Sequence, residues 1–186
     1  MQKLIFLIGA RGSGKTTLGE LLATKLGVPF HDSDQMVEAA AGMTVAQIVA
    51  KEGWGGFRRR ESTAVVELAN GQGVVASGGG AVLSSDNCRV MREHGWVIYL
   101  QAPAQVLAER LKVAPQDDHR PSLTGKGMIS ELAETLRQRE SLYVATADWC
   151  LDASQPLETL LADAMTMLEI AGKGGELTAK PEEPDA

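Results

Sequence analysis

The segment Leu4-Ile-Phe-Leu-Ile8 runs directly into Gly9-Ala-Arg-Gly-Ser-Gly-Lys-Thr16, and this stretch decides the fold. Its apolar residues do not alternate with polar ones, which predicts a strand buried on both faces of a parallel sheet. Apolar residues then recur with a period near 3.6 from Lys15 to Leu26, which predicts a helix that stops at Gly27. The side chains expected on its buried stripe are Leu18, Leu21, Leu22, Lys25 and Leu26.

The turn between this strand and helix satisfies the pattern G-x-x-x-x-G-K-[ST]. Glycines allow backbone N–H groups to turn inward and approach phosphate oxygens, and the helix N-terminus adds its positive dipole end. Lys15 can reach the β- and γ-phosphates, and the Thr16 hydroxyl can ligate Mg²⁺. The sequence therefore predicts a phosphate-binding loop (P-loop) for a nucleoside triphosphate. An ordinary glycine-rich turn is the alternative.

The rest of the chain alternates short apolar runs with longer helical patterns, as βαβ units do. This predicts an α/β fold of three layers (αβα), in which a five-stranded parallel sheet lies between two layers of helices. The fold is expected to form one domain over residues 1–171. Further strands are expected at residues 28–32, 74–76, 96–100 and 149–151, and further helices at 35–41, 44–51, 57–68, 104–112, 129–145 and 155–171.

Length and composition restrict the class of protein. A chain of 186 residues with 44% hydrophobic and 23% charged residues is typical of one globular domain. The net charge of -6 argues against nucleic acid as a partner, and no apolar run approaches the ~18 residues of a membrane span. Cys88 and Cys150 form no metal or disulfide pattern. We expect a cytoplasmic monomer.

Two segments have little to bury. Residues 114–126 form a polar loop, and loops of this length inside a compact domain are usually functional, so we expect a lid over about 112–126. From Gly172 to the end the chain is rich in charge and glycine, which predicts a disordered acidic tail over 172–186.

Polar and glycine residues follow two of the expected strands. Asp32 and Asp34 come at the end of the second strand, and Gly78, Gly79 and Gly80 come after the third. Ligands of parallel sheets bind at the carboxyl ends of the strands, so both segments are candidates for the site. One carboxylate can serve magnesium and the other can accept a proton from a hydroxyl. Helix capping by Ser33 or Asp34, and a plain glycine turn, are the alternatives.

Arginines are concentrated near the same edge. Successive helical residues turn by about 100°, so Arg58, Arg59 and Arg60 cannot share one face. We expect one of them to enter the cleft while the others are solvated, and Glu61 stands at the right spacing to orient Arg58. Further arginines stand at positions 120, 137 and 139. Such residues suit a carboxylate or a phosphoryl group.

Taken in order, the motifs from Leu4 to about Ala171 resemble the shikimate kinase family, whose P-loop fold is that of the nucleoside-monophosphate-kinase-like branch. Arg11 and Trp54 match an enteric-type subgroup of that family. The matching segments are Gly9-Ala-Arg-Gly-Ser-Gly-Lys-Thr16, Asp32-Ser-Asp34, Gly42-Met-Thr-Val45, Glu52-Gly-x-x-x-Phe-Arg58-x-x-Glu61, Ser77-Gly-Gly-Gly80, Arg120-Pro-x-Leu-Thr-Gly125 and Arg139-x-x-x-Tyr143.

The resemblance implies phosphorylation of the 3-hydroxyl of shikimate by ATP, with Mg²⁺, as a step in aromatic amino acid biosynthesis. It implies catalytic roles for Asp34, Lys15 and Arg120, with Arg120 in the lid. It assigns magnesium to Thr16 and Asp32, and it implies a shikimate-binding segment over about residues 33–61. The implied ATP ligands are Gly12, Ser13, Gly14, Lys15, Thr16, Thr17, Arg110, Arg120 and Gln155, and the implied shikimate ligands are Asp34, Arg58, Gly78, Gly79, Gly80 and Arg139.

Two other functions stay open. Another small-molecule kinase of the same branch, with an acceptor such as gluconate, would use the same P-loop but would not need two arginines for a carboxylate. A nucleotide-binding protein without catalysis would not need Asp34 or Lys15, and both are present. The sequence gives no role for Arg11, Arg59 or Arg60.

Overall fold

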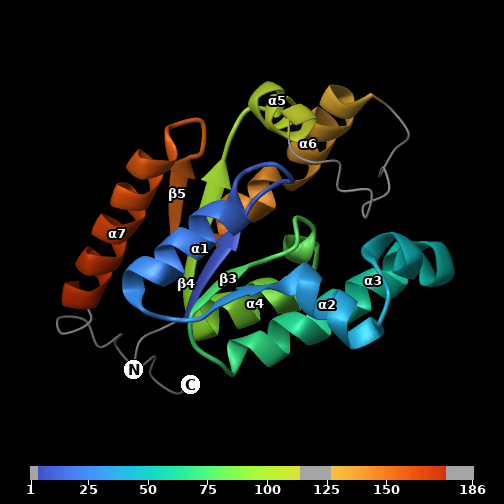
Figure 1. Cartoon of the computed structure of the whole chain (residues 1–186), viewed down its shortest axis with the longest axis horizontal. Helices are drawn as coiled ribbons and strands as arrows, with labels where there is room; N and C mark the ends of the chain where they lie inside the picture. Colours follow the sequence, from blue (N-terminus) through green and yellow to red (C-terminus); the bar gives the residue numbers. More distant parts are fainter. Residues whose placement is uncertain (1–3, 114–126, 175–186) are drawn as a thin grey trace, which may run out of the picture.

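The computed structural model describes residues 4–113 and 127–174. Five parallel strands form one sheet in the order β2-β3-β1-β4-β5, with helices on both faces (Figure 1). The predicted α/β architecture is confirmed. The elements are β1 (Leu4–Ile8), α1 (Lys15–Leu26), β2 (Phe30–Asp32), α2 (Ser33–Ala41), α3 (Val45–Ala69), β3 (Val74–Ala76), the short 3-10 helix η1 (Ala81–Leu83), α4 (Ser85–His94), β4 (Gly95–Gln101), α5 (Ala104–Val113), α6 (Met128–Thr146), β5 (Trp149–Asp152) and α7 (Leu157–Gly174).

Strand β1 lies at the centre of the sheet and is buried on both faces, as its continuous apolar run predicts. Ile5 and Leu7 belong to a core shared with helices α1, α5, α6 and α7. Leu4, Phe6 and Ile8 point to the other face, where they join a core built with α3, α4 and α6. The alternation of side chains along one strand therefore divides the interior into two cores.

Helix α1 has the predicted bounds and ends on Gly27, whose φ of 67° is the left-handed conformation of a C-cap. Its buried stripe is narrower than predicted. Leu18 and Leu22 are fully buried, but Leu21 is 40% exposed and Lys25 is also exposed. The prediction for those two residues is wrong, because Gly19 and Ala23 face the sheet in their place.

Helices α2 and α3 extend from the body of the fold and form a small core of their own (Figure 1). Thr44 caps α3 through a reciprocal bond with Gln47. The helix is interrupted at Gly53, whose φ of 69° and ψ of 176° are not helical. The two helices predicted over 44–51 and 57–68 are therefore the two halves of one kinked helix.

Several boundaries differ from prediction. Helix α4 was missed because its sequence is mostly polar, and Asn87 and Met91 are its buried residues. Strand β2 begins at Phe30 rather than residue 28, after Pro29. Helix α7 continues to Gly174, three residues into the segment that was predicted to be disordered. Residues 175–186, the rest of that segment, lie outside the described residues. So do residues 114–126 of the predicted lid, which include Arg120.

None of the helices within residues 4–113 and 127–174 is both long and apolar enough to cross a membrane. Cys88 and Cys150 are free thiols. In the same ranges no cluster of three or more His, Cys, Asp or Glu side chains is arranged to hold a metal ion.

The two leucines of α1 provide a matched test of the sheet-facing stripe. We expect Leu18→Ala to lower the free energy of unfolding by about 2–5 kcal/mol, because it leaves a cavity in a closed core. Leu21→Ala, the control in the same helix, should change it by less than about 1 kcal/mol. Urea unfolding of both variants measures the difference, and equal losses would contradict the assignment of the buried face.

Candidate active site

The P-loop joins β1 to α1, as predicted, and its glycines fulfil steric requirements. Gly9, Gly12 and Gly14 all have positive φ values, of 146°, 81° and 91°. A methyl group on Gly12 would lie 3.0 Å from the carbonyl oxygen of Leu107 and from Leu111 Cγ, both in α5. The backbone conformation of the loop and its contact with α5 therefore fix its shape. Its backbone N–H groups form the binding surface without side chains.

The Lys15 ammonium lies across this loop. Its Nζ donates hydrogen bonds to the carbonyl oxygens of Gly9 and Ala10 at 2.9 and 3.0 Å, and to Ser13 Oγ at 3.4 Å. Ser13 is buried. Thr17 is exposed on the first turn of α1.

Two oxygen side chains meet beside the start of α1. The Thr16 hydroxyl donates to Asp32 Oδ2 at 3.2 Å. The other oxygen of Asp32 accepts from the backbone N–H groups of Asp34 and Gln35, so Asp32, rather than Ser33 or Asp34, is the cap of α2. A hydroxyl and a carboxylate held next to a phosphate loop are the kind of oxygen ligands that Mg²⁺ prefers.

Arg110 lies beside the P-loop and reaches the β5–α7 loop, which contains Gln155. Arg110 donates to the carbonyl oxygen of Ala153 at 2.6 Å, and its Nη1 would be 3.9 Å from a methyl group on Gly14. Gln155 follows in the same β5–α7 loop and donates to Asp152 Oδ2 at 3.1 Å. The structure therefore brings Arg110 next to the loop that contains Gln155, which is far from it in the sequence.

The loop after β3 is held from the α2 side. The Ser33 hydroxyl is buried and accepts a hydrogen bond of 2.8 Å from the Gly78 N–H. A methyl group on Gly78 would overlap Glu61 Oε1 and lie 2.8 Å from Asp34 Oδ1. Gly78 is thus required for the approach of two acidic side chains, which sequence spacing did not indicate.

Arg58 enters the site, as predicted for one of the three consecutive arginines. Its Nη1 contacts Glu61 Oε2 at 2.5 Å, and its guanidinium lies 5.6 and 5.2 Å from the ring centres of Trp54 and Phe57. A methyl group on Gly80 would overlap the same guanidinium. Burial raises the pKa of the Glu61 carboxyl, and the charge of Arg58 opposes that shift.

The other arginines of that run lie elsewhere. Arg59 is exposed, and Arg60 forms two hydrogen bonds with Glu52, at 3.1 and 2.8 Å. Arg137, the exposed neighbour of Arg139 in the sequence, pairs with Glu134.

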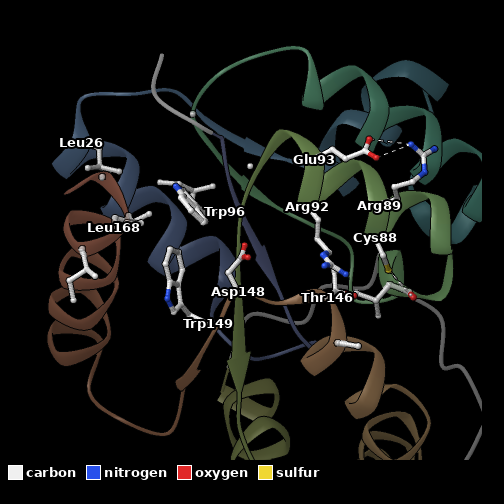
Figure 2. Close-up of a pocket in the computed structure, with 18 of the residues that line it drawn as sticks. Leu26, Cys88, Arg89, Arg92, Glu93, Trp96, Thr146, Asp148, Trp149 and Leu168 are labelled. Carbon is white, nitrogen blue, oxygen red and sulfur yellow. Dashed lines mark hydrogen bonds and ion pairs between the residues drawn. The ribbon is translucent and has the colours of Figure 1, made fainter. Parts of the chain in front are cut away.

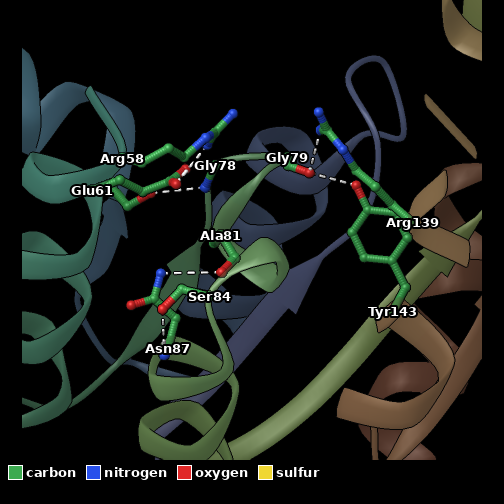
Figure 3. A network of polar contacts seen from close by, with 10 residues as sticks. Arg58, Glu61, Gly78, Gly79, Ala81, Ser84, Asn87, Arg139 and Tyr143 are labelled. Atoms are coloured by element: carbon green, nitrogen blue, oxygen red, sulfur yellow. Dashed lines mark hydrogen bonds and ion pairs between the residues drawn. The ribbon is translucent and has the colours of Figure 1, made fainter. Parts of the chain in front are cut away.

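Arg139 projects from α6 toward the same glycines (Figure 3). It is only 8% exposed, and its Nη1 donates to the carbonyl oxygen of Gly79 at 3.0 Å. The Tyr143 hydroxyl donates to the same oxygen at 2.5 Å. Tyr143 closes the motif Arg139-x-x-x-Tyr143, and its role was not predicted from the sequence.

These side chains surround one cavity of about 100 Å³ beside the P-loop. Three arginines line it: Arg11, Arg58 and Arg139. Arg11 had no role assigned from the sequence. Acidic and apolar side chains of α2, α3, α5 and α6 complete the wall: Asp34, Val45, Trp54, Phe57, Glu61, Leu111, Met128, Glu131 and Leu132. The cavity therefore offers guanidinium groups to an anionic group of a small ligand and carboxylates to its hydroxyl groups.

A larger open groove lies at the opposite edge of the sheet, where the strands begin (Figure 2). It contains the adjacent rings of Trp96 and Trp149, and at its α4 side Arg89 pairs with Glu93. Ligands of parallel sheets bind at the other edge, so this groove is separate from the site.

The fold and the site define a P-loop kinase for small molecules: a phosphate loop, a hydroxyl–carboxylate pair and an arginine-lined acceptor cavity meet at one sheet edge. The family model described as Shikimate kinase matches residues 11–169. Two relatives named Shikimate kinase 2, from Sodalis glossinidius and Yersinia enterocolitica, are 52% and 51% identical over 168 residues, covering 90% of this chain and 97% of each relative. The chain belongs to the shikimate kinase family, as the resemblance indicated.

Comparison with solved structures supports the same family. A shikimate kinase from Acinetobacter baumannii in complex with shikimate is 32% identical, with a TM-score of 0.84 over 96% of this chain and 97% of that one. A gluconokinase from Sinorhizobium meliloti has a TM-score of 0.60 at 19% identity, which shows a shared fold and no more.

The burial of Glu61 leads to a prediction about pH and stability. A raised pKa means that the folded chain binds this proton more tightly than the unfolded chain. The free energy of unfolding of the wild type should therefore rise relative to that of Glu61→Gln as the pH falls from neutral toward the ordinary value of 4.5. Urea unfolding of both proteins across this range tests the sign.

The exposed Glu67, in the same helix, provides the control Glu67→Gln. It measures the general effect of removing one carboxylate from α3. A difference between wild type and Glu61→Gln that is independent of pH, or that moves the other way, would contradict a buried carboxylate with a raised pKa.

Proposed function

We propose that the chain transfers the γ-phosphoryl group of ATP to the 3-hydroxyl of shikimate and releases ADP. The observation that carries this proposal is the single cavity in which Asp34 and the two guanidinium groups of Arg58 and Arg139 meet beside the P-loop. A planar carboxylate fits arginine forks, and a hydroxyl on the same small ring fits Asp34. The relatives named Shikimate kinase 2 and the shikimate-bound structure of the family support the choice of acceptor.

The P-loop supplies the phosphate site. Backbone N–H groups from Gly12 to Thr17 surround the phosphates, and Lys15 exchanges its carbonyl acceptors for phosphate oxygens. Thr16 and Asp32 have the oxygen atoms to hold Mg²⁺, Asp32 through water, and the ion when bound offsets phosphate charge. Arg110 and Gln155 border the adenine.

The acceptor side of the site positions shikimate and supplies a base. Arg58 and Arg139 hold the shikimate carboxylate, and N–H groups of the glycine loop, Gly78 to Gly80, contact the ring and the transferred group. Asp34 accepts the hydroxyl proton as the oxygen attacks phosphorus and the bond from the γ-phosphorus to the bridging oxygen of ADP breaks. Arg120 adds positive charge from the lid over about 112–126, which excludes water.

The proposal includes one domain over residues 1–171, with a shikimate-binding segment over about 33–61, acting as a monomer. We place the enzyme in the cytoplasm, since it uses ATP and its two cysteines are free thiols.

The first experiment measures ADP release with Mg²⁺-ATP in the presence of shikimate, quinate, gluconate or no acceptor. A strong response to shikimate alone is expected. A response to gluconate instead would favour the related small-molecule kinases. Binding of ATP with no stimulation by any acceptor would favour a nucleotide-binding protein without catalysis.

Asp34→Asn tests the base. We expect turnover to fall by roughly a hundredfold or more, because an amide cannot accept the hydroxyl proton, while ATP affinity stays near the wild-type value. Steady-state kinetics and ATP titration measure the two effects. The control is Asp163→Asn, an exposed aspartate of α7. Turnover retained in Asp34→Asn would remove this residue from the chemistry.

A further inference from the structure

The carbonyl oxygen of Gly79 is an unusual point in the site because two side chains of α6 donate to it. Arg139 Nη1 lies 3.0 Å and the Tyr143 hydroxyl 2.5 Å from this oxygen, and Figure 3 shows both reaching it from the same helix. A carbonyl oxygen has two lone pairs, so these two donors use its full capacity. The peptide between Gly79 and Gly80 is therefore fixed from the α6 side.

Fixing the carbonyl also fixes the N–H group of the next residue. A trans peptide is planar, and its C=O and N–H point in opposite directions. With the Gly79 oxygen directed at α6, the Gly80 N–H is directed away from α6. In the described part of the chain, neither the Gly79 nor the Gly80 N–H has a hydrogen-bond acceptor. These two donors are available to a ligand in the adjoining cavity.

The hydrogen bond to the Gly79 carbonyl oxygen also fixes the side chain of Arg139. Its Nη1 is occupied by Gly79, and its Nε is buried without a hydrogen-bond partner among the described residues. A buried donor in that state costs free energy until an acceptor reaches it. The carboxylate of the proposed substrate is such an acceptor. Arg139 can bind this carboxylate through Nε while its Nη1 stays on the Gly79 oxygen, which the Tyr143 hydroxyl also holds.

Tyr143 is well placed for this task. It is fully buried, and its ring stacks on that of Tyr99 with centres 4.9 Å apart and planes 18° apart. Burial raises the pKa of its hydroxyl, and the charge of Arg139 opposes the shift only in part, so the group remains a protonated donor at neutral pH. The stack holds the ring, and the hydroxyl has one direction in which to donate.

We infer that Tyr143 is a positioning residue for acceptor recognition: its hydroxyl holds the Gly79 carbonyl, and thereby directs the Gly80 N–H and keeps Arg139 beside the acceptor cavity. This inference rests on the proposed function for the identity of the acceptor. Tyr143 itself does not touch the reacting atoms.

The test compares Tyr143→Phe with Tyr99→Phe. Each removes one hydroxyl from the same stacked pair, but the Tyr99 hydroxyl lies beside Glu140 and not beside the glycine loop. In Tyr143→Phe the KM for shikimate should rise roughly 2- to 10-fold, the effect of one lost hydrogen bond. The KM for ATP should match that of Tyr99→Phe, which itself should keep the wild-type KM for shikimate.

A second readout does not depend on the substrate. The Gly80 amide resonance in an NMR spectrum of the ligand-free protein should shift in Tyr143→Phe and stay in place in Tyr99→Phe. A wild-type KM for shikimate in Tyr143→Phe would overturn the inference, as would equal changes in the two variants or a parallel rise in the KM for ATP. If the wild type does not phosphorylate shikimate, the proposed function fails, and the Gly80 resonance alone decides whether Tyr143 positions the loop.

Discussion

The site depends on a short stretch of backbone without side chains, the three glycines that follow β3. Asp34 and Glu61 press against the first of them, the Arg58 guanidinium covers the third, and α6 binds the carbonyl of the second. A single methyl group on the first or third glycine would overlap a charged side chain. Side chains from three helices, α2, α3 and α6, can therefore converge on this loop only because it presents bare peptide groups.

The same loop joins the two halves of the site. A methyl group on Gly79 would lie 3.4 Å from the carbonyl oxygen of Gly9, at the start of the P-loop. The P-loop in turn contacts α5 through Gly12, and α5 leads into the segment proposed as the lid. The proposed nucleotide and acceptor sites thus share adjoining backbone, in loops that follow neighbouring strands of the sheet.

The sequence predicted the features that local spacing controls. The strand from Leu4 to Ile8 follows from a continuous apolar run, the P-loop from a fixed motif, and the pairing of Arg58 with Glu61 from the spacing of one helical turn. Helix α4 was missed because polar residues dominate it. The bond between Ser33 and Gly78, and that between Tyr143 and Gly79, connect residues 45 and 64 positions apart, and no spacing rule reaches that far.

The order of the strands has a consequence for the behaviour of the protein at high concentration. The outer strands, β2 and β5, have three and four residues, whereas β4, inside the sheet, has seven. Pro29 precedes β2 and has no N–H to offer to a neighbour. An exposed sheet edge is a template for pairing with another chain, and here both templates are short. The topology that brings the site together therefore also limits edge-to-edge aggregation.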